Sequence, residues 1–503
     1  MKFKLIVSTG LAMAVSVILA MSVIASGALP GSGWWTQETV QNVDPANASG
    51  AVSVVAYDAS SASTFSTIGS SLDGGWARTF SPSDFTGMSA GFSGSGVVQS
   101  SVPAVALVTI TNQPVGGGLG VAGGRARERF QGMISPGSPL YFPLAKHAWY
   151  GYTDIFYIQN AGGVAATAQA VFTAFSGLTY TYTTPLIGPN QMVVISPLDA
   201  GMPNCCGVGK GPHNLTWENL GAMTISSSQP MAGTYIEYVV AETTATVINS
   251  TRGFASTDLD TSAFAPVVKR NWYGRYTGIS VLNIETSSIT ATVTFTGTVV
   301  AGVNNPCAGK GYVESQGIAA GKAGVFVQKA GSTLIPEGCL ASATISANGR
   351  IVVLVNEEQV AGATRRAGIA YFASPANSTT TKLAAPYYTD RRGGFYSGLQ
   401  IENVGSVSAT NVVATFYCYG GSNGTTQFTA ISTPRTIDSG GSFNFVRPNT
   451  MPAGTFTPAN PFASQNALCS VIVTSDQPIV ANINEDNSAV VNDANYEGFN
   501  LAP

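Results

Sequence analysis

Polar and apolar residues alternate along this chain in short runs with a period of two, and helical periodicity is almost absent after the N-terminal apolar stretch. The runs are rich in Val, Ile, Thr, Tyr and Phe, as in 53–57, 292–295 and 412–417, and Gly, Pro, Asn and Ser separate them. This pattern is typical of half-buried strands joined by turns. Many short strands at regular spacing predict an all-β chain of antiparallel β-sandwiches.

The strands recur in one register around four anchor asparagines, which are separated by 118, 123 and 120 residues. The anchors are Asn42, Asn160, Asn283 and Asn403. A glycine stands nine residues before each anchor, at Gly33, Gly151, Gly274 and Gly394. A shared register predicts tandem copies of one folded unit. We expect each asparagine to open a turn in which its side chain bonds the backbone two residues on.

The order of elements is also shared between the copies. Three copies begin with a proline-led strand 17 residues before the anchor, at Pro143, Pro266 and Pro386. A glycine turn with aromatic residues, the anchor strand, a variable stretch and a closing strand follow. The closing strands are expected at 103–108, 229–232, 350–355 and 477–481, and three of them lead to a glutamate: Glu237, Glu357 or Glu485. The first copy lacks the leading strand and this glutamate.

We therefore predict a signal peptide at 1–27 and four Ig-like modules at 28–130, 138–253, 262–372 and 382–503, the first of them atypical. Short linkers predict an elongated array that behaves as a semi-rigid rod, and 118–129 is interpreted as the first linker. The order of basic head, apolar run and small residues at 1–30 is that of a secretory signal. A retained membrane anchor is the alternative, because the run is about long enough to span a bilayer. After removal of the signal no membrane span is expected.

Charge is scarce, since only 10% of residues are charged and the formal net charge is −3. An average soluble protein has roughly 25% charged residues. No basic stripe is present to meet phosphates, which excludes nucleic-acid binding. A surface built from Ser, Thr, Asn, Gln and Gly is instead usual in exported β proteins, so we expect a secreted, extracellular or cell-surface protein.

The cysteines agree with export. Disulfides Cys307–Cys339 and Cys418–Cys469, each within one copy, are the economical pairing for an oxidising compartment. Metal binding is the competing interpretation, but no Cys-x-x-Cys spacing occurs and the chain has just two histidines. The adjacent Cys205 and Cys206 leave three alternatives open: a vicinal disulfide, an intermolecular link, or reduced thiols.

The order Trp-Tyr-Gly, strand-Asn-x-Gly and Gln-Pro-Ile-Val-Ala-x-Ile-Asn-Glu resembles tandem immunoglobulin-like modules of secreted bacterial surface proteins, similar to CARDB-type adhesion repeats. The resemblance covers nearly the whole mature chain, and its motifs are structural. It implies an adhesive, structural or assembly role at a cell surface, without catalysis.

Two enzyme-like strings occur, and neither has the context that its chemistry requires. Gly87–Gly91 fits a nucleophile elbow but lies in a Gly/Ser-rich loop, and Gly118–Gly123 fits a dinucleotide fingerprint without a packed helix after it. We expect no enzyme, no cofactor and no metal site. Calcium at Glu357-Glu358 and Glu485-Asp486 is conceivable at strand ends, but solvated turn residues are the favoured interpretation there.

Aromatic residues near the glycine turns are the remaining candidates for binding. They are Trp34, Trp35, Trp149, Tyr150, Trp272, Tyr273, Phe395 and Tyr396. Repetition in register favours packing, because large rings dominate core energetics, and stacking platforms for glycans are the alternative. The expected function is a structural or adhesive surface component, with self-association or other surface components as partners. The open edge of the first module suggests head-to-tail filaments or a surface layer, and a naturally shorter first module is the alternative.

Overall fold

The computed structural model describes residues 29–501 apart from 32, 47–48, 113–125, 205–216, 242–243, 301–302, 329–333, 362–363, 422–423, 447–450, 452–453, 458–461, 463–465 and 487–493. The predicted signal peptide, the dinucleotide-like string and Cys205-Cys206 lie outside the described residues. The chain is all-β: its described regular elements are strands and four short 3-10 helices, and every pairing between the named strands is antiparallel.

We divide the strands into four segments by their order along the chain. The first segment contains β1 (Trp35–Asn42), β2 (Gly50–Asp58), β3 (Thr64–Ser66), β4 (Ser70–Leu72), β5 (Ala77–Phe80), η1 (Pro82–Asp84), β6 (Gly94–Ser100), β7 (Ala104–Thr111) and β8 (Arg127–Gln131). The second contains β9 (Leu140–Lys146), β10 (Tyr152–Asn160), β11 (Ala168–Ala174), β12 (Thr179–Thr183), β13 (Met192–Ile195), β14 (Leu220–Ser227), β15 (Met231–Ala241) and β16 (Thr244–Arg252).

In the third and fourth segments, one long strand (β22 or β32) takes the place of the two strands β14 and β15 of the second segment. The third segment contains η2 (Ser256–Asp258), β17 (Asp260–Trp272), β18 (Arg275–Asn283), β19 (Ile289–Gly297), β20 (Gly311–Ile318), β21 (Ala323–Val327), β22 (Cys339–Ala361), β23 (Thr364–Phe372) and β24 (Ser374–Pro375). The fourth contains η3 (Ala376–Ser378), β25 (Thr380–Asp390), η4 (Arg392–Gly394), β26 (Tyr396–Asn403), β27 (Ala409–Gly420), β28 (Thr426–Ser432), β29 (Arg435–Ile437), β30 (Ser442–Val446), β31 (Phe456–Thr457), β32 (Ala467–Asp486), β33 (Ala494–Glu497) and β34 (Phe499–Asn500).

The same pairings recur in each segment. The strand that ends at the anchor asparagine pairs with the closing strand, in β1–β7, β10–β15, β18–β22 and β26–β32. The closing strand then turns back into a final strand, in β7–β8, β15–β16, β22–β23 and β32–β33. Buried and exposed residues alternate along many outer strands, such as β19 and β27. The predicted sandwich-like, antiparallel architecture is therefore confirmed at this level.

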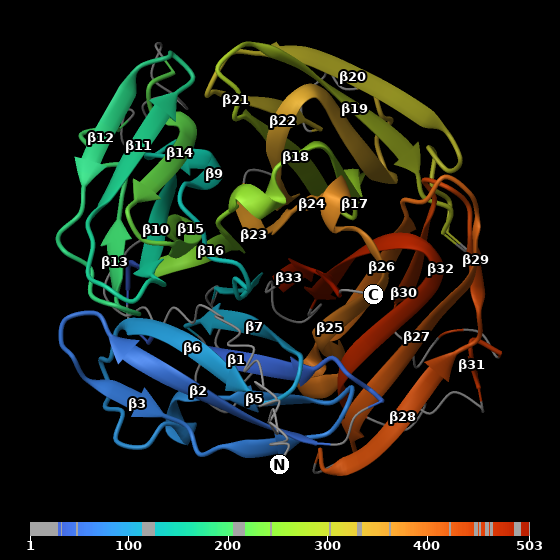
Figure 1. Ribbon diagram of the computed structural model, residues 1–503. Coiled ribbons are helices and arrows are strands. Elements are labelled where there is room, and N and C mark those ends of the chain that lie inside the picture. The colour runs from blue at the N-terminus through green and yellow to red at the C-terminus, as the bar shows by residue number, and fades with distance from the viewer. Residues whose placement is uncertain are drawn as a thin grey trace, which may run out of the picture.

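The four final strands meet at the centre of the molecule. β8 contacts β16, β16 contacts β23, β23 contacts β33, and β33 contacts β8 again. In Figure 1 the segments accordingly surround a common centre, with the first beside both the second and the fourth. The predicted elongated array is thus wrong. The segments close into a ring because the final strands bury one another. In an extended rod these strands would stay exposed.

At each of the four junctions, a corresponding loop contacts the preceding segment. This loop contains the residue whose carbonyl accepts the backbone N–H of the anchor asparagine. These residues are Trp76, Gln191, Lys322 and Gly441. Gln191 donates to the carbonyl of Ser61 (2.6 Å), and Lys322 donates to that of Phe175 (3.1 Å). In the fourth segment the carbonyl of Gly440 accepts from Ser342 (3.3 Å). Trp76 packs on two tyrosines of the fourth segment, so the first and last segments join as the others do.

The anchor asparagines are completely buried and tie two turns to the strand end. Asn403 shows the arrangement: its Oδ1 accepts the N–H of Gly405 (2.9 Å), and its Nδ2 donates to the carbonyls of Val407 and Ile437 (both 2.8 Å). The turn bond to the residue two positions on is present at all four anchors, as predicted. The glycines nine residues earlier all have positive φ, between 76° and 84°, which only glycine adopts without strain.

Both predicted disulfides are present, Cys307–Cys339 and Cys418–Cys469, and their cysteines are buried in the cores of the third and fourth segments. Two disulfides are typical of an oxidising, extracellular environment. No helix among the described residues is long and apolar enough to cross a membrane.

The anchors provide a direct test of this local design. Asn403→Ala leaves three backbone groups without their partner, of which the carbonyl of Ile437 is buried, and a buried group left unpaired costs about 1–3 kcal/mol. We expect a loss of roughly 2–4 kcal/mol in the free energy of unfolding, measured by urea denaturation. The matched control is Asn411→Ala, an exposed residue in the same segment, which should change stability little. Equal effects of the two substitutions would contradict the role assigned to the anchor.

Candidate functional site

The three closing glutamates are buried, which corrects the expectation that Glu357 and Glu485 are solvated turn residues. Glu237, Glu357 and Glu485 have exposed fractions of 1–2%. Glu358 is partly exposed and Asp486 is exposed, so only one member of each acidic pair faces solvent. A buried carboxylate is costly unless it is paired and hydrogen-bonded. Each glutamate accordingly has a defined set of partners.

The first partner comes from the leading strand, at the residue three positions after its proline. This residue is Lys146, Lys269 or Thr389. Lys146 forms an ion pair with Glu237, and Lys269 Nζ lies 2.9 Å from Glu357 Oε1. Thr389 donates its hydroxyl to Glu485 Oε2 (3.0 Å). The backbone N–H of the same residue donates to a side-chain oxygen of the anchor strand: Asp154, Thr277 or Ser397. The cluster thus joins the leading, anchor and closing strands of one segment.

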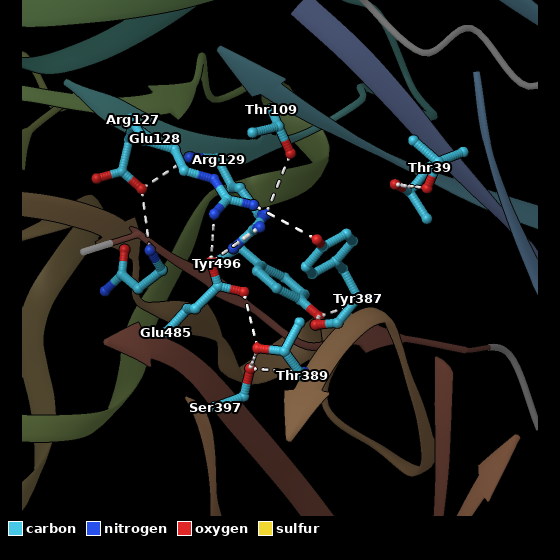
Figure 2. Close-up of polar contacts among 12 residues, drawn as sticks. Thr39, Thr109, Arg127, Glu128, Arg129, Tyr387, Thr389, Ser397, Glu485 and Tyr496 are labelled. Carbon is cyan, nitrogen blue, oxygen red and sulfur yellow. Dashed lines mark hydrogen bonds and ion pairs between the residues drawn. The ribbon is translucent and has the colours of Figure 1, made fainter. Parts of the chain in front are cut away.

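The fourth segment lacks the lysine, and the first segment supplies the missing positive charge. Arg127 Nη1 and Arg129 Nη2 lie 2.8 and 3.2 Å from Glu485 Oε1 (Figure 2). Burial alone would raise the pKa of Glu485, but the charges of Arg127 and Arg129 outweigh it and hold that pKa below its ordinary value. Both arginines belong to β8, so this ion pair joins the first segment to the fourth.

Aromatic rings and polar groups complete the environment of these arginines. The guanidinium of Arg129 lies 3.9 Å from the ring centre of Tyr387, and its Nε donates to Thr109 (3.1 Å). Arg127 lies 4.5 Å from the ring centre of Phe395. Arg129 is 1% exposed, and cation–π contacts are strongest at such desolvated sites. The residues 127–129, interpreted from the sequence as part of a linker, are therefore a buried strand with an electrostatic role.

A second set of contacts at the centre links β8 to β33. Glu128 Oε1 accepts the backbone N–H of Asn495 (3.0 Å), and Gln131 donates to the carbonyl of Glu497 (2.9 Å). Burial raises the pKa of Glu497 to about 8, although the nearby Arg252 opposes this shift. Arg252 itself is held by two 2.8 Å bonds to Asp258. The closure of the ring thus depends on ionisable groups that have left water.

The aromatic turns lie directly beyond these clusters, where leading and anchor strands join. Tyr150 and Tyr273 are 47% and 72% exposed, whereas Trp149 and Trp272 are partly buried beside them, with ring centres 5.3 and 5.2 Å apart. Trp217, 41% exposed, packs on Trp149 at 5.0 Å. In the fourth segment Phe395 is buried and Tyr396 is partly buried. Trp34 is likewise buried and Trp35 partly so.

The backbone of the aromatic turns is strained. The described residues include seven non-glycine positions with positive φ, at 48–62°. Five of them lie in the three turns, namely Ala148, Tyr150, Asn271, Tyr273 and Arg391, and a sixth is Trp217. Left-handed conformations are costly for aromatic residues and cluster at binding sites. The turns therefore hold Tyr150 and Tyr273 in a left-handed backbone conformation, with much of each side chain exposed beside its tryptophan.

Other chemical candidates from the sequence are not brought together. Ser89 of the elbow-like string is exposed in a loop between η1 and β6. His147 is buried and its Nδ1 lies 2.7 Å from the carbonyl of Met202, while His213 lies outside the described residues. Within the described ranges no three His, Cys, Asp or Glu residues are grouped as a metal site. Sequence reasoning missed the two lysines, although their constant distance from the leading proline could have revealed them.

Removing the negative charge of Glu485, which joins the first and fourth segments, should destabilise the fold. Glu485→Gln leaves two arginines buried without their counter-charge, and breaking a buried pair in this way costs about 3–5 kcal/mol. We expect faster hydrogen exchange in β8 and β33 and a lower urea midpoint. Glu285→Gln removes a solvent-exposed pair with Arg350 and should change stability little, because exposed ion pairs contribute little. Unchanged exchange in β8 would show that the ion pair does not hold the junction.

The raised pKa of Glu497 predicts a distinct pH dependence. Because the folded protein retains this proton between the ordinary pKa of 4.5 and about 8, the stability contributed by protonated Glu497 is lost as pH rises through this window. The slope from one group is at most about 1.4 kcal/mol per pH unit. Relative to the parent, Glu497→Gln should show a smaller fall in urea stability as pH rises through this window. Parallel pH profiles would refute the assignment.

Comparisons with known proteins identify no family for this chain. No family model matches it, and no curated protein matches it. Among solved structures, the one titled "Crystal Structure of Thermotoga maritima 1070" is similar over 24% of this chain and 97% of that chain, with 15% sequence identity and a TM-score of 0.19.

Proposed function

We propose that this chain is a secreted, non-enzymatic adhesive component of a bacterial cell surface, built from four Ig-like modules, and that it binds glycans through its aromatic turns. The single observation that carries the glycan assignment is the outward exposure of Tyr150 and Tyr273 on strained turns. Packing, the interpretation favoured by repetition alone, accounts for the neighbouring Trp149 and Trp272. Each tyrosine ring meets its tryptophan edge-on, but packing leaves 47% of Tyr150 and 72% of Tyr273 exposed.

The four-module interpretation is supported by the recurring pairings and by the anchors. Anchor, closing and final strands follow one order in all four segments, and each anchor makes the same turn bond. The leading strand is present as β9, β17 and β25, and no strand precedes β1 in the described part of the first segment. This supports four copies of one module with an atypical first copy.

The chemistry of the exposed turns suits saccharides. A tyrosine ring offers an apolar face to the C–H groups of a sugar and a hydroxyl for hydrogen bonding. The low charge of the chain suits a polar, weakly charged ligand better than a nucleic acid. Equivalent positions of the turns in the second and third segments would place two sugar contacts on one molecule, and linked contacts of this kind raise apparent affinity.

Self-assembly through the first module has less support. The faces of the first segment that lie toward the fourth are used within the chain, through contacts of β25 with β1 and β7 and of β8 with β33. A filament or surface layer would need another surface. Adhesion by isolated rings is therefore the function that the geometry favours.

The test is binding to a glycan array. Tyr150→Ala and Tyr273→Ala should each weaken binding to the recognised glycan about tenfold, because truncating a tyrosine that is a binding hot spot costs more than about 1 kcal/mol. Urea stability should stay close to that of the parent, since both rings are exposed. Val407→Ala is the matched control. This exposed residue follows Asn403, at the end of the anchor strand that is opposite to the aromatic turn. Glycan binding that survives the double tyrosine substitution would sink the assignment.

A further inference from the structure

A cavity of about 380 Å³ opens between the first and fourth segments. Its walls come from β1, β4 and β5 on one side, and from β25, β27, η4 and β32 on the other. The residues that matter for its chemistry are Arg78, Arg392, Tyr387, Tyr417, Tyr419 and Ser470. The volume lies within the range of about 300–1,000 Å³ that is usual for small-ligand sites.

The charge of this cavity is one-sided. Arg78 and Arg392 line it, and none of its lining residues is an aspartate or glutamate. Arg78 lies over the ring of Phe80, 5.1 Å from its centre. The guanidinium of Arg392 lies against Gly424, where a Cβ would stand 1.9 Å from Nη1. Within the part of the chain that the structure describes, neither guanidinium forms an ion pair, in contrast to the paired arginines of β8.

The aromatic wall of the cavity is held in place from behind. Trp76 packs edge-on against Tyr417 and Tyr419, with ring centres 5.9 and 4.9 Å away. The ring of Tyr417 also lies so close to Gly75 that a Cβ there would stand 2.3 Å from it. Ser470 donates its hydroxyl to the carbonyl of Gly75 (2.7 Å), which fixes this loop on the fourth segment. The wall is therefore preorganised by contacts across the junction.

We propose that this cavity binds an anionic saccharide, with Arg78 and Arg392 receiving its carboxylate or sulfate group and the tyrosines contacting its ring. Arginine binds such anions through two parallel N–H bonds, which gives both affinity and orientation. A simple inorganic anion would leave most of the cavity empty and would not reach the rings of Tyr417 and Tyr419. The site extends the proposed glycan function to a second ligand class. It uses neither Tyr150 nor Tyr273, although Arg392 belongs to the turn of the fourth segment.

The experiment is isothermal titration calorimetry of the mature chain with three probes: an oligogalacturonate, a chondroitin sulfate oligosaccharide and a neutral cello-oligosaccharide. At least one anionic probe should bind, with an affinity that falls as salt is raised. Arg78→Gln and Arg392→Gln should each weaken that binding about tenfold or more, the loss expected for a hydrogen bond to a charged group. Arg350→Gln, a surface arginine paired with Glu285 outside the cavity, should leave binding unchanged.

Two further readouts keep this proposal separate from the aromatic-turn proposal. The Tyr150→Ala, Tyr273→Ala double variant should retain binding of the anionic probe, and thermal unfolding of both arginine variants should match the parent. Equal binding of the neutral probe, or full affinity in the arginine variants, would overturn the cavity assignment. Loss of anionic binding in the tyrosine double variant would place the ligand at the turns instead.

Discussion

A buried carboxylate that stays ionised needs a positive partner, and this requirement organises the clusters at Glu237, Glu357 and Glu485. In the second and third segments the partner is a lysine of the same segment, so each cluster is complete by itself. In the fourth segment threonine stands at that position, and the arginines of β8 supply the charge from the far end of the sequence. Because the desolvation of Glu485 is costly without them, the fourth segment is electrostatically complete only when the first closes upon it. Closure is thus a condition for burying this glutamate.

The same closure creates the surfaces to which function is assigned. The ion-pair clusters fix the ends of the leading and anchor strands, and the turns that join these strands carry the exposed tyrosines. The junction of the first and fourth segments also forms the cavity with two arginines, which neither segment has alone. A ring of this kind separates two tasks. Local hydrogen bonds at the anchors hold each segment together, whereas charges at the centre and loop contacts at the rim hold the segments to one another.

The interpretations that failed share one physical cause. Arg127, Glu128 and Arg129 are all charged, and such a run following a glycine-rich stretch is ordinarily solvated. Glu485 stands before an aspartate near a strand end and was interpreted in the same way. Each group is costly to bury alone, and single-sequence patterns cannot show that an opposite charge lies beside it. Residues 129 and 485 are 356 positions apart, and only the closed ring brings them within 3.2 Å.

The sequence by itself determined what depends on neighbours along the chain. Alternation defined the strands, the spacing of the four asparagines defined the repeats, and the Asn turns and glycine conformations followed from local backbone chemistry. The two disulfides were also predictable, because each closes within one copy. Tertiary structure alone decided that the four segments form a ring instead of a rod, that the closing glutamates are buried, and that Tyr150 and Tyr273 face outward while Phe395 does not. These outcomes depend on which surfaces and charges come into contact between segments. A short-range pattern in one sequence does not indicate these contacts.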